Sequence, residues 1–177
     1  MQYSYLVELY HSLEKTTKRL EKTALLAAFL KKVPAKEIKD VVSLAQGIVF
    51  PPWDERKIGF SSQLMLKAIH VASGASINAV EKLWSKKGDL GLVAAEIMGK
   101  KTQMTLVQHA LTVDKVITNI RKLSTLEGAG TVDKKIGLVA ELLTSASHEE
   151  ARFIVRTILE ELRVGIASGI LRDSIAR

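Results

Sequence analysis

The stretch SHEEARFIVRTILEEL, residues 147–162, decides the fold class of this chain. Ser147, with Glu150 three residues later, forms the capping-box pattern that starts a helix. The apolar residues that follow recur at spacings of three and four and therefore share one helix face: Ala151, Ile154, Val155, Ile158, Leu159 and Leu162. The stretch predicts an amphipathic helix with one buried side.

Helical spacing continues outward from this stretch, and no convincing run of alternating polar and apolar residues predicts a strand. Gly165 interrupts the helical pattern, and a short final helix is expected after it, up to Ala176. Upstream, side chains that can cap helix starts alternate with glycines that can end helices. The expected helices cover residues 3–15, 16–32 with Thr16 or Thr17 as the cap, 35–47, 61–71 with Ser61 or Ser62 as the cap, 76–86, 89–98, 112–123 and 131–143. We therefore predict an all-α fold, a compact multi-helix bundle of about ten to twelve helices.

Two segments between these helices are predicted to be irregular or extended. PPWDERK at 51–57 should be a loop, because prolines and charges interrupt both helices and strands. Residues 103–107 are expected to form a short extended piece. In the helix at 35–47, the residues expected to face the core are Ile38, Val41, Val42 and Ala45.

The composition fits one globular domain that spans residues 1–177. With 47% hydrophobic residues and no cysteine, the chain can bury a core without disulfides or metal ions. The longest uncharged stretch, residues 41–53, is too short for a bilayer and is broken by glycine and proline, so we predict no membrane segment. The chain start lacks the features of a secretory signal, and we therefore expect a cytoplasmic protein.

The charge balance leaves two interpretations open. The chain has 26 basic and 19 acidic residues, a net charge of +7, which suits a polyanionic partner such as nucleic acid. Many merely soluble proteins have the same balance. Because there is no basic tail, any basic surface must be assembled by folding.

Motifs of the common catalytic sites are absent from the sequence. It contains no GxxxxGK[ST] phosphate loop, HExxH, GxSxG or Lys-x-Asp-Gly, the last being the motif of covalent nucleotidyltransferases. The histidines are scattered along the chain, at His11, His70, His109 and His148. We therefore expect neither a catalytic site nor a metal site in this chain.

The sequence GAGTVDKK at 128–135 places two glycines before a helix whose first turns carry Lys134 and Lys135. A helix amino terminus has a partial positive charge, so lysines there cost on the order of 0.3 to 1 kcal/mol unless an anion lies nearby. Glycines also let backbone N–H groups approach a phosphate oxygen closely. The turn is either a phosphate-binding site or a flexible connector whose charge Asp133 offsets.

A related pattern occurs in KIGFSSQLMLK at 57–67, where Gly59 and a serine precede a helix and lysines stand close by. Helix capping alone explains the serines equally well. The recurrence of a glycine before a helix start, here and at Gly128 with Gly130, leaves open a division of the bundle into two similar halves.

Five stretches together resemble the amino-terminal DNA-binding domain of ATP-dependent DNA ligases of the archaeal and eukaryotic type. They are KIGFSSQLMLKAI (57–69), KKGDLGLVAAE (86–96), QMTLVQHALTVDKVITNIRKLS (103–124), GAGTVDKKIGLVAELLTSASHEEARFIVRTI (128–158) and ELRVGIASGIL (161–171). Their order and spacing are similar to those of the family. The resemblance covers essentially the whole chain, and an archaeal origin fits it best.

This resemblance implies a bundle of about a dozen helices that binds nicked duplex DNA along its minor groove, without reading base sequence. In the family, separate nucleotidyltransferase and OB-fold domains seal the nick during DNA replication, repair and recombination. The full-length enzyme would use ATP and a divalent cation such as Mg²⁺, whereas this chain alone would need no cofactor. A sliding clamp is a further candidate partner, and no membrane is implied.

The resemblance also assigns candidate DNA contacts. They are Gly59, Phe60, Ser61, Ser62 and Lys67, then Gly128, Ala129, Gly130, Thr131, Lys134 and Lys135, and finally Arg163, Val164 and Gly165. The sequence departs from the family at Phe60, where a small aliphatic residue is usual, and at Ala129 and Thr131, where a polar residue and serine are usual. Arg163 is favoured for contact over the arginines of the preceding helix.

The GDLG block at 88–91 is interpreted as structural, because Gly88 can end one helix and Asp89 can start the next. Two other functions remain alternatives for the chain as a whole. One is a helical adaptor or scaffold that binds protein through an apolar groove, and the other is a small enzyme with an unrecognised site. Salt-dependent binding of duplex DNA would distinguish the first alternative from a DNA-binding domain.

Overall fold

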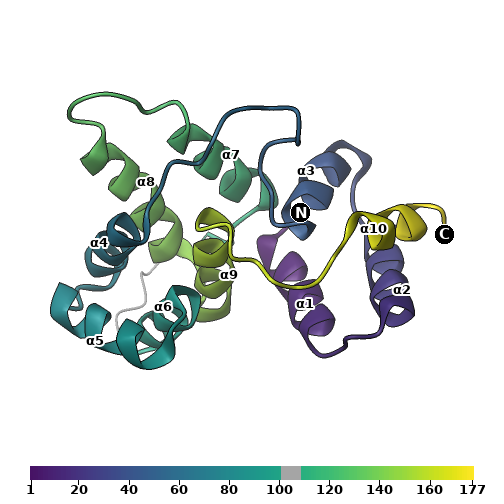
Figure 1. Ribbon diagram of the computed structural model, residues 1–177, viewed down its shortest axis with the longest axis horizontal. Coiled ribbons are helices and arrows are strands. Elements are labelled where there is room, and N and C mark those ends of the chain that lie inside the picture. Colours follow the sequence, from purple (N-terminus) through teal and green to yellow (C-terminus); the bar gives the residue numbers. More distant parts are fainter. Residues whose placement is uncertain (101–108) are drawn as a thin grey trace.

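The structure, a computed structural model, describes residues 1–100 and 109–177 (Figure 1). Its elements are α1 (Tyr3–Glu14), α2 (Arg19–Leu30), the 3-10 turn η1 (Ala35–Glu37), α3 (Ile38–Ala45), α4 (Ser62–Ser73), α5 (Ile77–Lys87), α6 (Leu90–Gly99), α7 (Val113–Leu123), α8 (Val132–Ser145), α9 (His148–Ile158) and α10 (Ser168–Ile175). The ten α-helices of the described residues confirm the predicted all-α bundle. Extended pairing in those residues is limited to an isolated antiparallel bridge between Gln2 and Thr112. The extended piece expected at 103–107 lies outside them.

The helices form two groups along the long axis of the molecule (Figure 1). The terminal group consists of α1, α2, α3 and α10 and contains both ends of the chain, whereas the central group consists of α4 to α9. The most extensive packing in the central group is that of α6 on α9 and of α4 on α8, and in the terminal group α10 packs on α2. Contacts of α1 with α9 and of α3 with α7 join the two groups.

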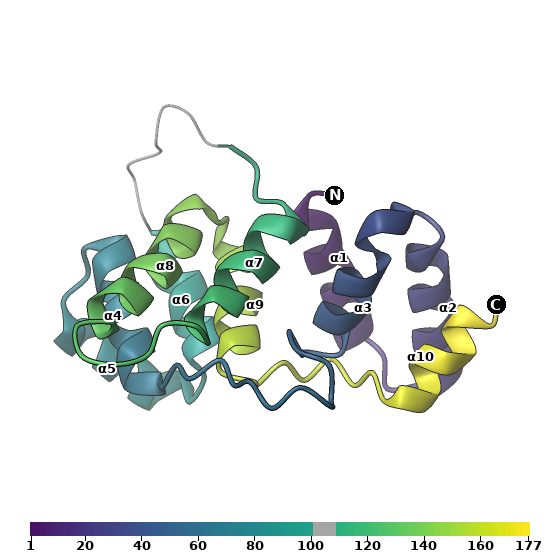
Figure 2. The ribbon, with the colours of Figure 1, turned by 90° about the horizontal axis from the view of Figure 1, so that it is seen from above.

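Two irregular segments connect the groups: residues 46–61, the first crossing segment, and residues 159–167, the second. Both run along the lower edge of Figure 2, which is the face turned toward the viewer in Figure 1. The predicted loop at 51–57 lies in the first of them and is confirmed. Arg121 of α7 holds this segment, because its Nε donates to the Val49 carbonyl at 2.8 Å and its Nη1 pairs with Asp40 at 2.9 Å.

The buried residues of both groups form one continuous core. Its largest fully buried side chains include Tyr3, Tyr10 and Phe153, which lie where α1 packs on α9. The rings of Tyr10 and Phe153 are 4.9 Å apart between centroids, and the Tyr10 hydroxyl donates to the Leu44 carbonyl at 2.8 Å. Aromatic packing therefore joins the terminal group to the central group.

Most predicted helix starts are confirmed by side-chain caps. The side chains of Ser61, Ser76, Asp89, Thr112 and Ser147 accept hydrogen bonds from backbone N–H groups in the first turns of α4, α5, α6, α7 and α9. At α9 the capping box with Glu150 is complete. Gly74 and Gly88 end α4 and α5 in the left-handed conformation, as the sequence predicts.

Two predicted caps are wrong. Thr131 precedes α8, but its backbone is already helical (φ −87°, ψ −16°) and its hydroxyl donates to the Gly128 carbonyl at 2.7 Å. A cap needs an extended backbone that aims the side-chain oxygen at the next turn, and Thr131 lacks it. Neither Thr16 nor Thr17 caps α2, which begins at Arg19 after Lys18. The Thr16 hydroxyl instead accepts from the Lys18 N–H at 3.1 Å, before the helix starts.

The helix predicted at 35–47 is shorter than expected and begins differently. Residues Ala35–Glu37 form the 3-10 turn η1, and the α-helix proper starts at Ile38. Val41 and Ala45 are buried as predicted, and Val42 packs partly against the core. Ile38 is 41% exposed, so its predicted inward position is wrong. As the first residue of α3, Ile38 lies a full turn before the buried part of the helix.

Candidate nucleic-acid interface

The two glycine turns singled out by the sequence lie together at the starts of α4 and α8. The Lys135 ammonium donates to the Gly59 carbonyl at 3.3 Å, although 76 residues separate them. Because α4 and α8 pack on each other, both turns belong to the same side of the central group. We call residues 57–62 and 128–135 the α4–α8 corner. The glycine recurrence thus relates two neighbouring helices of one group.

The turn before α8 leaves its backbone accessible. Gly128 and Gly130 have φ values of +92° and +80°, and nothing would lie within 4 Å of a Cβ at either position. Their role is therefore conformational, since few other residues adopt these angles. No side chain caps α8, so the first N–H groups of a 14-residue helix have no side-chain acceptor. This end of the helix suits an anion.

Cations without partners surround this helix start. In the described part of the chain, the ammonium groups of Lys57 and Lys134 make no hydrogen bond or ion pair, and both residues are exposed. Next to them is a shallow hollow of about 490 Å³ whose lining includes Lys57, Gly59, Glu127 and Lys135. An oxyanion there would have Lys57 and Lys135 in the lining, together with the carboxylate of Glu127.

Arg56 lines the same hollow, but its guanidinium already has partners within the chain. Its guanidinium pairs with Asp54 at 2.6 Å and lies over the Phe50 ring, 4.5 Å from the centroid. This hydrogen bonding lowers the pKa of the Asp54 carboxyl to about 2. Arg56 is therefore a weaker candidate for phosphate contact than Lys57 or Lys134.

The remaining predicted contacts at the start of α4 differ in their surroundings. Phe60 is buried in the core, so its side chain is not available to a ligand. The Ser61 hydroxyl caps α4 by accepting from the Leu64 N–H at 3.3 Å. Ser62 is the first helical residue and is half-buried, whereas Lys67 is exposed farther along α4. Phe60 would contribute only backbone groups, and Lys67 a charge.

The third predicted cluster, Arg163 to Gly165, lies in the second crossing segment. Lys22 of α2 donates to the Val164 carbonyl at 2.6 Å, and the Val164 side chain is buried. Gly165 has a φ of +72°, and a Cβ there would collide with the Lys22 ammonium. Arg163 is exposed and has no partner among the described residues. The turn is therefore anchored by Lys22 at Val164 and Gly165, and the adjacent Arg163 is exposed.

The first and third clusters share one face of the molecule. Residues 57–61 are in the first crossing segment and residues 163–165 in the second, and both segments run along the same edge in Figure 2. The fold thus distributes the candidate contacts over a surface, and no single deep pocket holds them all.

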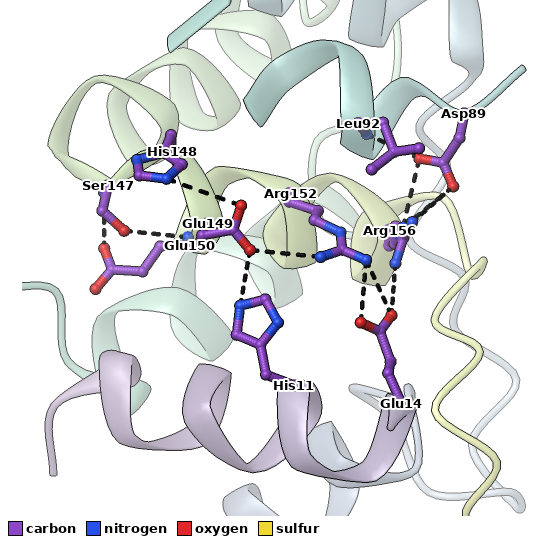
Figure 3. Close-up of polar contacts among 10 residues, drawn as sticks. All are labelled: His11, Glu14, Asp89, Leu92, Ser147, His148, Glu149, Glu150, Arg152 and Arg156. Carbon is purple, nitrogen blue, oxygen red and sulfur yellow. Dashed lines mark hydrogen bonds and ion pairs between the residues drawn. The ribbon is translucent and has the colours of Figure 1, made fainter. Parts of the chain in front are cut away.

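The arginines of α9 belong to a different arrangement, a network that links α1, α6 and α9 (Figure 3). Arg156 pairs with Glu14 at 2.9 Å and with Asp89 at 3.0 Å. Arg152 pairs with Glu14 at 3.0 Å and with Glu149 at 3.4 Å, and His11 approaches Glu149 at 2.7 Å. Both guanidinium groups are thus occupied by carboxylates. This network is not predictable from the spacing of its residues in the sequence.

The GDLG block is structural, as predicted. Asp89 caps α6 and also accepts from Arg156. Burial raises the pKa of the Asp89 carboxyl, but hydrogen bonds from the Leu92 N–H and from Arg156 outweigh burial, and the net pKa lies below its usual value. Gly91 lies directly against α9, where a Cβ would be only 2.7 Å from the Arg152 carbonyl oxygen. This glycine permits the close packing of α6 on α9.

The described residues contain neither a cluster of metal ligands nor a membrane-spanning helix. Within residues 1–100 and 109–177, no group of three or more acidic or histidine side chains is placed to hold a metal ion. The His70 Nδ1 lies 2.6 Å from the Ala75 carbonyl, and His11 belongs to the α9 network. Across the same residues, no helix combines the length and apolarity that a bilayer crossing requires.

The similarity of the chain to known proteins identifies its family. The family described as "DNA ligase N terminus" matches residues 2–176. This chain belongs to the DNA ligase N-terminus family. The predicted resemblance is therefore confirmed. In this ligase N-terminal domain, the α4–α8 corner and the second crossing segment contain the residues that the family motifs single out, except Lys67, which lies farther along α4.

Relatives of this ligase N-terminal domain include archaeal DNA ligases. The DNA ligase of Methanothermobacter thermautotrophicus is 44% identical over 175 residues, which are 99% of this chain and 31% of that protein. Those of Methanobrevibacter smithii and Thermococcus fumicolans are each 41% identical, over 100% and 99% of this chain and 32% and 31% of their own lengths. The chain thus spans about a third of the curated relatives it matches.

Proposed function

We propose that this chain binds nicked duplex DNA, independently of base sequence, as the N-terminal domain of an ATP-dependent DNA ligase. The observation that supports this most strongly is the α4–α8 corner. There an uncapped helix start, an exposed glycine turn and lysines without acidic partners lie side by side. These are the features that bind phosphate oxygens through backbone N–H groups and charge.

The distribution of contacts supports binding to a duplex rather than to a small ligand. Arg163 on the second crossing segment and the corner lie on the same broad face, so they could contact separate phosphates of one duplex. Backbone N–H groups, lysine and arginine bind phosphates without distinguishing bases. This lack of sequence preference suits an enzyme that must act at a nick in any sequence.

The chemistry of nick sealing would belong to the rest of a full-length ligase. Because the chain contains no Lys-x-Asp-Gly, we propose that a nucleotidyltransferase domain elsewhere provides the adenylated lysine, with ATP and Mg²⁺, and that an OB-fold domain assists. The same proposal includes action on chromosomal DNA in the cytoplasm, during replication, repair and recombination. It also includes contact with a sliding clamp.

A titration of a fluorescent nicked duplex with the purified domain, at two salt concentrations, tests the proposal. With about four phosphate contacts, from Lys57, Lys134, Lys135 and Arg163, log K should fall against log salt with a slope of about −3.6. Affinity should be micromolar or weaker, as is usual for non-specific binding (Kd about 10⁻⁶ to 10⁻⁴ M), and should drop about 100-fold between 50 and 200 mM salt. A duplex of unrelated sequence should bind equally well. Absence of salt-dependent binding would favour the helical adaptor.

Incubation with radiolabelled ATP tests the division of labour. The domain alone should acquire no covalent adenylate and should leave a nick unsealed, because it has no lysine in the nucleophile motif. A labelled protein band that survives denaturation would show that the chain is itself an enzyme.

A further inference from the structure

An apolar groove lies between α1 and α2, in the terminal group. It has a volume of about 500 Å³, and its apolar lining includes Tyr5, Leu9, Leu25, Ala28, Phe29 and Pro34. Tyr5 is 51% exposed and Leu25 is 36% exposed. Large apolar side chains grouped in a concave surface are typical of a site that buries another apolar surface.

The segment of chain that follows α2, at one end of this groove, is rich in lysine. Lys32 lines it, and three other lysines lie within the neighbouring segment of chain: Lys31, Lys36 and Lys39. The two acidic residues of this segment are committed elsewhere, since Glu37 binds the terminal amine of Met1 at 2.6 Å and Asp40 binds Arg121 at 2.9 Å. Among the described residues, the four ammonium groups therefore have no acidic partner.

The groove is separate from the candidate DNA interface. Met1 lines the groove, and Figure 2 shows the amino terminus at the upper edge of the molecule, opposite the edge along which both crossing segments run. A duplex on the α4–α8 corner and Arg163 would leave the groove uncovered. A phosphate backbone also fits this groove poorly. An apolar lining is stabilised by contact with another apolar surface, and a phosphate backbone is charged.

We propose that the α1–α2 groove binds an amphipathic, acidic helix of a partner protein. Apolar side chains spaced three and four apart on that helix would cover Tyr5, Leu25 and Phe29. The carboxylates of that helix would lie near Lys32, which attracts them. Glu8 also lines the groove and would repel carboxylates placed beside it. This inference does not depend on the proposed DNA binding.

The experiment uses a fluorescent synthetic helical peptide of about 15 residues, with leucines along one face and glutamates in its last turn. A matched peptide has lysines in place of the glutamates. The domain should bind the acidic peptide about tenfold more tightly than the basic one, measured by anisotropy. Tyr5→Ser should weaken this binding about tenfold, and Lys32→Glu with Lys36→Glu should reverse the preference between peptides. All three positions are surface positions, so circular dichroism should show an unchanged fold.

A control variant, Lys134→Glu with Lys135→Glu, should bind the acidic peptide as well as the wild type does. Equal affinity for both peptides, or full binding by Tyr5→Ser, would overturn the proposal. The proposal would also be overturned if a nicked duplex displaced the peptide and the variant with Lys32→Glu and Lys36→Glu lost duplex binding. That result would instead make the groove part of a nucleic-acid surface.

Discussion

Two sets of cations differ sharply in their surroundings, although the sequence alone does not distinguish them. Arg152 and Arg156 of α9 are nearly enclosed, with side chains 17% and 11% exposed, and each contacts two carboxylates. Lys57 and Lys134 at the α4–α8 corner are exposed and contact no carboxylate of residues 1–100 and 109–177. The first set holds helices together, and the second is free to bind an external anion.

The difference separates cations that stabilise helix packing from cations that are available to an external anion, such as a phosphate of the proposed duplex. A guanidinium already held by carboxylates must lose those contacts before it can bind a phosphate. A lysine without a partner loses only its hydration and some freedom of movement. The comparison therefore predicts which substitutions reduce stability and which reduce affinity.

The largest expected effect is that of Arg156→Ala. It leaves Glu14 and Asp89 without one of their partners at the contact of α1, α6 and α9, which should cost about 2 to 3 kcal/mol. The Tm should fall by about 5 to 10 °C, while the folded fraction binds duplex normally. Arg172→Ala is the matched control, because Arg172 is 80% exposed in its side chain and its loss should cost little. Normal thermal stability of Arg156→Ala would remove the distinction between the two sets.

The next effect is expected for Lys134→Glu combined with Lys135→Glu. Loss of two phosphate contacts should weaken duplex binding about 20-fold near 0.1 M salt and flatten the salt slope by roughly two units. Thermal stability should change little or rise, since acidic residues suit a helix start better than lysines do. Lys82→Glu with Lys86→Glu changes the net charge equally on α5 and should affect binding far less. If the two doubles behave alike, the turn before α8 is only a connector.

A smaller effect is expected for Arg163→Ala. One phosphate contact fewer should weaken binding about fivefold and change the salt slope by about one unit. Because Arg163 has no partner in the described part of the chain, the Tm should remain that of the wild type. Comparison with Lys22→Ala is informative, since that substitution removes the anchor of the turn and leaves the arginine in place. Unchanged affinity of Arg163→Ala would restrict the interface to the α4–α8 corner.

The smallest effect concerns the pH dependence of the α9 network. The pKa of Asp89 is lowered in the folded state, so its ion pair stabilises the fold above the unfolded pKa of about 3.9 and is lost as pH falls through the folded value. Asp89→Asn keeps the cap of α6 but removes the charge, which should cost about 0.5 kcal/mol at pH 7 and progressively less as the pH falls through the lowered pKa of Asp89. Thermal melts across this range measure the difference. An offset that persists in acid would mean that the contribution is not ionic.

Local features of the fold were largely predictable from the sequence. Caps such as Ser76 and Thr112 act within three residues, so their pattern is visible in the chain itself. The failures at Thr131 and Ile38 have one cause in common. Each stands at a helix boundary whose backbone depends on the preceding turn, and a side-chain pattern does not determine that turn.

The candidate site was only partly predictable, because its electrostatics depend on residues far apart in sequence. The motifs drew attention to the corner and to Arg163, but not to which arginines would be neutralised. Glu14 meets Arg156 across 142 residues, and Lys22 meets Val164 across the same separation. Such pairs are set by helix packing. The burial of Phe60, which excludes its side chain from contact, also follows from packing.

The docking of α10 on α2 has a consequence for synthesis on the ribosome. Ser174 donates to the Thr23 carbonyl at 3.1 Å and Arg19 pairs with Asp173 at 2.6 Å, across more than 150 residues. At translation rates of about 5 to 20 residues per second, α2 must wait on the order of ten seconds before its last neighbour emerges. The helices α4 to α9 can pack on one another during that interval. In the nascent chain, the central group should therefore finish packing before the terminal group, which needs α10.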